Sequence, residues 1–76
     1  MGQVEHIGLA TDELETLRLC DLLGLTQEEA GERMGVSRGT VQRIVKRARA
    51  KVARALVEGA AIIIDPAKGD CEDASV

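Results

Sequence analysis

Residues 26–44 of this 76-residue chain read TQEEAGERMGVSRGTVQRI, and this stretch decides the fold. It predicts a short helix over 27–34, a three-residue connection over 35–37 and a longer helix over 38–58. Polar residues and glycines stand where each helix should begin and end, which is how helix boundaries are recognised in a sequence.

The boundary residues fit a tight connection between two helices. Thr26 and Glu29 match a capping box, in which each side chain binds a free backbone N–H at the helix start. Gly35 can adopt the positive φ of a turn, and Ser37 is suited to cap the next helix. Gly31 is small where the two helices must approach closely. This order of residues predicts a helix-turn-helix rather than a plain helical bundle. Its apolar contacts are expected from Ala30, Met34, Val36, Val41 and Ile44.

Outside this motif the sequence predicts one more helix and two strands. Thr11 is expected to cap a helix that runs to about Leu23, with Gly24 following its end. Residues 4–9 and 61–65 resemble strands, the second because of three consecutive isoleucines. The two strands could pair within one chain or across a dimer.

The chain length allows a single domain. We expect a mainly α fold over residues 1–65: a three-helix helix-turn-helix domain with a long recognition helix and flanking strands. Residues 66–76 are polar and acidic, and they are expected to form a disordered tail.

The charges of the chain are segregated. The net charge is −3, but residues 37–57 carry seven basic and no acidic residues, whereas residues 1–36 have a net charge of −6 and residues 58–76 one of −4. A basic block of this kind favours a polyanionic partner. The chain has no aromatic residue. This argues against a protein that binds single-stranded nucleic acid by stacking the bases on aromatic side chains. Duplex DNA needs no such stacking.

The predicted long helix has two distinct faces. At about 100° per residue, one arc holds the apolar positions Val41, Ile44, Val45, Ala48, Val52, Ala55 and Leu56. The opposite face holds Gly39, Arg43, Lys46, Ala50 and Arg54. The second face is therefore a basic stripe directed away from the core.

In a helix-turn-helix the first residues of the second helix contact base edges in the major groove. Arg43 can bind guanine and Gln42 adenine, so these two are the expected base-contacting residues. Residues at helix starts commonly hold phosphates. The expected DNA-binding residues are Gln27, Ser37, Arg38, Gly39, Thr40, Gln42, Arg43, Lys46 and Arg47. The major groove is about 12 Å wide, so we expect only Ser37–Arg47 to enter it, and we call this segment the reading head. Arg49, Lys51 and Arg54 are expected to flank the DNA backbone or stay solvated.

Residues 9–64 resemble a small prokaryotic family of predicted DNA-binding proteins, domain of unknown function 134. The resemblance rests on TDELE (residues 11–15), QEEA (27–30), MGVSRGTVQRI (34–44) and residues 53–59. The long helix also resembles region four of sigma factors, which binds promoter DNA. The resemblance implies a DNA-binding role with an unknown target. Members of the family often carry a Cys- and Arg-containing N-terminal extension, which this sequence does not show.

No residue pattern indicates enzyme chemistry, a metal site or a cofactor. His6 is the single histidine, Cys20 lies among leucines as a small apolar residue, and Cys71 stands in the acidic tail. We expect a cytoplasmic transcriptional regulator that binds specific double-stranded DNA, without a membrane segment. A homodimer is expected, with residues 62–64 as its interface. The alternative is a protein-interaction module that docks its basic helix on an acidic partner in the transcription machinery.

Overall fold

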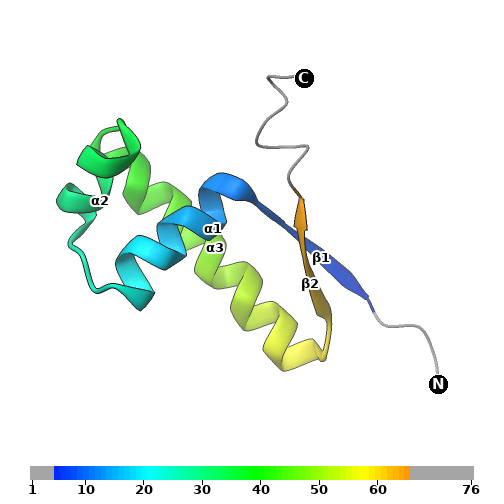
Figure 1. The fold of residues 1–76 in the computed structure, drawn as a ribbon. Coiled ribbons are helices and arrows are strands. Elements are labelled where there is room, and N and C mark those ends of the chain that lie inside the picture. The colour runs from blue at the N-terminus through cyan, green and yellow to red at the C-terminus, as the bar shows by residue number, and fades with distance from the viewer. Residues whose placement is uncertain (1–4, 66–76) are drawn as a thin grey trace, which may run out of the picture.

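The computed structural model describes residues 5–65 of the chain. Its elements, in chain order, are β1 (His6–Ala10), α1 (Thr11–Leu17), the π-helical turn η1 (Arg18–Leu22), α2 (Gln27–Met34), α3 (Arg38–Glu58) and β2 (Ala61–Asp65). Figure 1 shows α1 lying across the middle of the long α3. The helix α2 lies near the start of α3, and the two strands lie beside its second half. The described part of the chain is therefore mainly helical, with a small two-stranded sheet.

The boundaries of α2 and α3 agree with the prediction. Thr26 accepts a hydrogen bond from the Glu29 amide at 3.0 Å, and the Glu29 carboxylate accepts one from the Thr26 amide at 2.9 Å. Gly35 ends α2 with a φ of 75°, and Ser37 caps α3 by accepting from the Thr40 amide. These caps satisfy backbone N–H groups that a helix start leaves without a partner.

Gly31 is required by the connection between α2 and α3. A Cβ atom at this position would lie 2.7 Å from the carbonyl oxygen of Val36. The Gly31 carbonyl also accepts a hydrogen bond from the Val36 amide at 2.9 Å. The chain thus turns back against α2 at a distance that excludes any side chain, as the sequence predicts.

The core lies between the first helix, formed by α1 and η1, and the helices α2 and α3. Leu19, Ala30 and Val41 are completely buried there, and Cys20, Leu25 and Met34 pack against them while keeping some exposure. The core face of α3 is buried at Val41, Ile44, Val45, Ala48 and Ala55. This face fixes how α3 is rotated and so determines which of its side chains reach solvent.

Two members of the predicted apolar set lie outside the core. Leu56 is 79% exposed, because α1 crosses the middle of α3 and does not reach its last turn (Figure 1). Val36 is 38% exposed in the connection before α3. Val52 is half-buried. Helical periodicity gives the direction of a side chain, but it does not say how far the covering helix extends.

The first helix begins differently from the prediction. Ala10, not Thr11, occupies the N-cap position, and Thr11 is the first helical residue. The methyl group of Ala10 cannot accept a hydrogen bond, so the capping contact is made only by Glu13, whose carboxylate accepts from the Ala10 amide at 2.9 Å. The prediction of a Thr11 cap was therefore wrong, because the carboxylate two residues later already binds the free amide.

The helix ends in the wider η1 turn. The Leu23 amide donates to the carbonyl of Arg18 at 2.9 Å, which is a step of five residues. Gly24 then follows with a φ of 79°, in the place predicted for the end of this helix. A π-helical turn leaves no pattern in the sequence that the prediction could have used.

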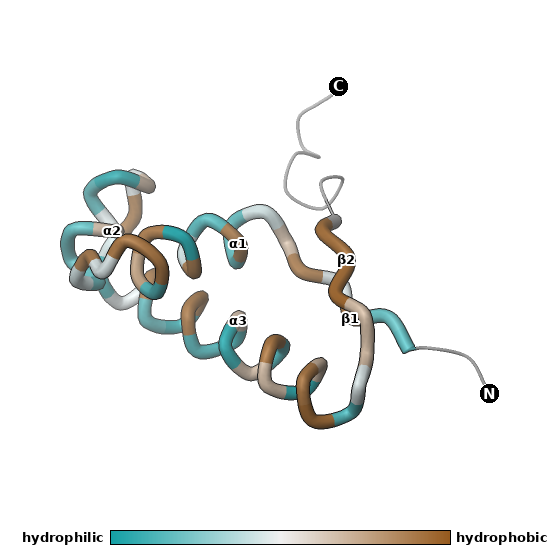
Figure 2. Tube along the Cα trace, turned by 60° about the horizontal axis from the view of Figure 1, so that its bottom comes forward, coloured by the Kyte–Doolittle hydropathy of each residue, from teal (hydrophilic) through white to brown (hydrophobic). Residues whose placement is uncertain are grey.

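The two strands pair with each other in parallel within one chain. Ile7 lies opposite Ile62 and Leu9 opposite Ile64. Ile7 and Leu9 are buried against the helices, whereas Ile62, Ile63 and Ile64 are 37–48% exposed. The predicted strand over 4–9 is shifted to His6–Ala10, and Val4 lies outside the described residues. Figure 2 shows β2 as a run of hydrophobic residues at the edge of the molecule.

Over residues 5–65, no helix combines the length and apolar character needed to cross a bilayer. The predicted tail, residues 66–76, lies outside the described residues, as does Cys71.

Candidate nucleic-acid interface

The predicted reading head, Ser37–Arg47, comprises the N-cap and the first half of α3. Arg38, Gly39, Gln42, Arg43 and Lys46 are all exposed there. Arg38 and Lys46 are eight positions apart, so they span about 12 Å along the helix axis at 1.5 Å per residue. Gly39 has no side chain and leaves this face of the helix low. These five predicted DNA-binding residues thus share one solvent-facing surface.

The residues at the two helix starts are partly engaged in local contacts. The Ser37 hydroxyl lies 3.0 Å from the Thr40 hydroxyl and accepts from the Thr40 amide at 3.2 Å. Thr40 and Gln27 are half-buried, and Ser37 is exposed. Ser37 therefore caps the helix and still faces solvent. The dipole of α3 adds a partial positive charge at the same end.

Arg47, the last residue of the reading head, is tied to α1. Its Nε donates to Glu13 Oε2 at 2.6 Å, and Lys51 Nζ donates to Glu13 Oε1 at 2.7 Å. Lys51 also donates to the carbonyl of Gly8 at 2.9 Å. The Glu13 side chain is only 1% exposed, while those of Arg47 and Lys51 are 54% and 32% exposed. We call Glu13, Arg47 and Lys51 the Glu13 cluster.

The Glu13 cluster keeps its carboxylate ionised. Burial by itself would raise the pKa of Glu13, but the hydrogen bonds from Lys51, the Ala10 amide and Arg47 outweigh it and lower the pKa to about 2. A buried carboxylate needs such partners, because an unpaired charge in the protein interior is costly. The cluster therefore fixes the first turn of α1 against the middle of α3.

Two further cations of α3 are paired within the chain. Arg49 donates through Nη2 and Nε to the two oxygens of Asp21, at 2.6 and 3.1 Å. This contact lowers the pKa of Asp21 and raises that of Arg49. Arg54 lies 3.1 Å from Glu58 and 3.6 Å from Glu5. These residues were predicted to flank DNA or remain solvated, and the structure places each beside an acid.

Arg38, Arg43 and Lys46 differ from the other basic residues of α3. Among the residues that the structure describes, none of the three has an acidic side chain within ion-pair distance. We call these three the exposed cations. The basic block contains no acid of its own, but Glu13 and Asp21 of the first helix and Glu5 before β1 come to it through folding. The surface with unneutralised positive charge is therefore shorter than the basic block.

The sequence analysis missed the Glu13 cluster. An acid in the first turn of a helix is favoured by the helix dipole, which is a sufficient local reason for the presence of Glu13. The one signal available was the i, i+4 spacing of Arg47 and Lys51, which puts both on the same side of α3. That spacing does not identify an acid 34 positions earlier in the chain.

The remaining candidate residues form no second site among the described residues. His6 is exposed on β1, and Cys20 is half-buried near the core. Burial raises the pKa of the Cys20 thiol, and the Asp21 carboxylate adds to this effect. A thiol of this kind is a poor nucleophile. Within residues 5–65 no three His, Cys, Asp or Glu side chains lie together as metal ligands would.

Comparison with known proteins identifies the family. A family model described as "Protein of unknown function DUF134" matches residues 1–72. The chain belongs to this DUF134 family. A UPF0251 protein of Desulforudis audaxviator is 58% identical over 65 residues, which cover 86% of this chain and 42% of that protein. One of Thermococcus kodakarensis is 62% identical over 60 residues, covering 79% of this chain and 53% of that protein.

A more distant DUF134 relative comes from Vibrio parahaemolyticus. That UPF0251 protein is 51% identical over 61 residues, which cover 80% of this chain and 64% of its own length. The chain spans about half the length of the first relatives it matches. No solved structure matches the chain.

Proposed function

We propose that this chain binds double-stranded DNA, with α2 and α3 acting as a helix-turn-helix and the reading head entering the major groove. The observation that carries the proposal is the position of the exposed cations. They lie over about 12 Å of one helix, and the major groove is about 12 Å wide. The other basic residues of α3 have acidic partners in the fold.

Base recognition is assigned to Arg43 and Gln42. An arginine can donate two hydrogen bonds to O6 and N7 of guanine, and a glutamine can bind N6 and N7 of adenine. Both side chains are exposed. Gly39 removes the side chain that would otherwise hold the groove wall away from the helix. Arg38 and Lys46, at the two ends of this surface, are assigned to phosphates.

Arg47 has a different role in this proposal. Its Nε is bound to Glu13, but the guanidinium group has further N–H donors and its side chain is 54% exposed. Arg47 can thus hold a phosphate while it remains bound to α1. Such a contact fixes the orientation of the domain on the duplex and carries no information on sequence.

The biological role that fits this interface is transcriptional regulation in a prokaryote, similar to promoter binding by region four of sigma factors. A docking module for an acidic protein partner would use the same exposed cations. The two functions differ in one respect: a duplex-binding domain selects particular base sequences, whereas an acidic protein surface has no bases to read.

The test is selection of bound duplexes from a random library, followed by mobility shifts with the selected sequence. We expect wild type to select a short motif, and Arg43→Ala to bind it with a loss of about 1–3 kcal/mol and relaxed preference at one position. Arg33→Ala is the matched control, because Arg33 is exposed on α2 and has no ion pair among the described residues. The absence of a shift with every duplex at about 50 mM salt overturns the proposal.

A further inference from the structure

The first helix buries polar residues and exposes apolar ones. Glu13 and Thr16 are 1% and 0% exposed, whereas Leu14 and Leu22 are 41% and 76% exposed. Glu13 is buried because it binds Arg47 and Lys51, and the Thr16 hydroxyl donates to the carbonyl of Asp12 at 2.7 Å. The inner side of the helix therefore has a structural reason for its polarity. Among residues 5–65, no contact gives the outer leucines such a reason.

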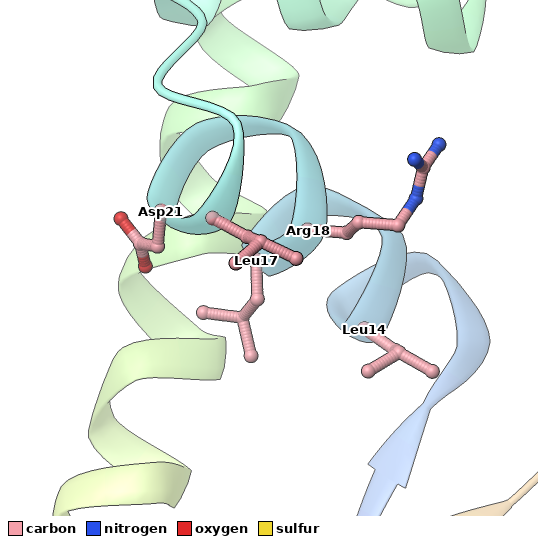
Figure 3. A pocket seen from close by; sticks show the side chains of 5 residues that line it. Leu14, Leu17, Arg18 and Asp21 are labelled. Carbon is pink, nitrogen blue, oxygen red and sulfur yellow. The ribbon is translucent and has the colours of Figure 1, made fainter.

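The outer leucines line a shallow groove. It is formed by Leu14, Leu17 and Leu22, together with Arg18 and Asp21. We call these five residues the α1 groove. Figure 3 shows Leu14 and Leu17 pointing to the same side of the helix, with Arg18 and Asp21 directed away on either side of them. Exposed apolar surface with a polar rim is typical of a protein interface.

We propose that the α1 groove is the surface through which two copies of this chain associate. The argument for a second copy is charge complementarity. Arg18 and Asp21 carry opposite charges and lie three positions apart in η1, so a two-fold axis passing between them sets each Arg18 beside Asp21 of the other copy. The same axis sets Leu17 against Leu22. A two-fold interface requires a surface that is complementary to itself, and the α1 groove meets this condition.

Both charged groups can serve this contact without losing the partners they have. Arg18 Nη2 and Nε bind Glu15 at 2.7 and 3.1 Å, which leaves Nη1 and one further N–H on the guanidinium. Asp21 accepts from Arg49, and each carboxylate oxygen has a second lone pair. The intrachain contacts hold both side chains in place. Less freedom is therefore lost when the second copy binds.

This proposed interface differs from the one expected from the sequence, which stays a prediction. Residues 62–64 were expected to form it, and Ile63 is indeed 48% exposed, on the sheet face that Gly8 shares. None of the residues in the α1 groove belongs to the reading head, so association leaves α3 open to solvent.

The test is sedimentation equilibrium of the chain without DNA, over a wide range of protein concentrations. We expect wild type to reach the mass of two chains, and Leu22→Glu to weaken association by about tenfold or more. Ile63→Glu is the matched control, because it places the same charge on the other exposed apolar face. It should leave the dissociation constant of the dimer unchanged.

A second pair of variants tests the charge contact. Arg18→Asp is expected to weaken association, because it sets two acids together across the axis, and Arg33→Asp on α2 is expected to have no effect. Circular dichroism and urea unfolding confirm that each variant is folded. If Leu22→Glu does not fold, Arg18→Asp decides the question alone, since Arg18 is exposed and outside the core.

A wild-type chain that stays monomeric, or a dimer that Ile63→Glu disrupts and Leu22→Glu does not, overturns the proposal. Because DNA is absent, its failure is distinct from a failure of DNA binding.

Discussion

Arg47 Nε lies 2.6 Å from Glu13 Oε2, although 34 positions separate the two residues. Arg47 belongs to the basic block that the charge pattern assigns to a polyanion, and Glu13 is almost completely buried. The contact joins the first turn of α1 to the helix that carries the exposed cations. Arg47 thus contributes to the fold and lies in the same half of α3 as the exposed cations.

Replacing Glu13 by glutamine should destabilise the chain. Glu13→Gln preserves the shape of the side chain, but its amide cannot accept through both terminal atoms from Arg47 and Lys51. The free energy of unfolding is expected to fall by about 1–3 kcal/mol, below the cost of breaking a fully buried pair because both cations can return to water. Urea unfolding measures this change.

Glu15→Gln is the control for that variant. Glu15 binds Arg18 at 2.7 Å, but both side chains are more than 40% exposed. Exposed pairs contribute about 0–1 kcal/mol. Equal losses for the two variants would mean that the Glu13 cluster contributes no more than a surface pair.

The Glu13 cluster also predicts how stability depends on pH. The pKa of Glu13 is about 2 in the folded chain and 4.5 in its ordinary state. Well above pH 4.5 the carboxylate is ionised in both states, so its full contribution is present. Between these two values the unfolded chain binds the proton and the folded chain does not, so stability falls as the pH is lowered. The contribution is on the order of 3 kcal/mol at most.

Urea unfolding of wild type and Glu13→Gln from pH 6 down to pH 2 tests this dependence. The lowered pKa values of Glu15 and Asp21 act in the same direction, but they are common to both proteins. The difference in stability between wild type and variant should therefore shrink as the pH falls. A difference that stays constant over the whole range would show that the charge of Glu13 contributes nothing.

The turn between α2 and α3 gives a prediction about Gly31. Gly31→Ala places a Cβ atom 2.7 Å from the carbonyl oxygen of Val36, so the backbone must move. Overpacking of this kind costs about 1–3 kcal/mol. Gly39→Ala is the control, since its Cβ would meet nothing nearer than the Ser37 hydroxyl at 4.0 Å. Gly39→Ala should be neutral or stabilise by up to about 1 kcal/mol. Thermal unfolding distinguishes the two, and a Gly31→Ala variant as stable as wild type would contradict the close approach.

What the sequence predicted correctly depends on residues close together in the chain. The ends of α2 and α3 follow from Thr26, Glu29, Gly35 and Ser37, each of which acts on backbone groups within four positions. The exposure of Arg43 follows from helical periodicity and from the apolar face opposite to it.

What the sequence did not predict depends on contacts between distant segments. The Glu13 cluster requires α1 to pack across α3, and Asp21 reaches Arg49 only through the same packing. The exposure of Leu56 depends on where α1 crosses, not on its own neighbours in the chain. Charge counted along the sequence therefore overestimated the positive surface, since it could not include acids brought in by folding.

The salt dependence of DNA binding separates paired from exposed cations. Lys46→Gln should lower the slope of log affinity against log salt by about one unit, because one phosphate contact is lost. Arg49→Gln removes the same charge from the same helix, but Arg49 is bound to Asp21 at 2.6 Å. Its slope should stay close to that of wild type. The comparison keeps the net charge equal, so a difference between the two variants reports a local contact.

Mobility shifts of the selected duplex at several salt concentrations give both slopes. Equal reductions for Lys46→Gln and Arg49→Gln would show that DNA responds to the total charge of α3, and the assignment of phosphate contacts to the exposed cations would then fail.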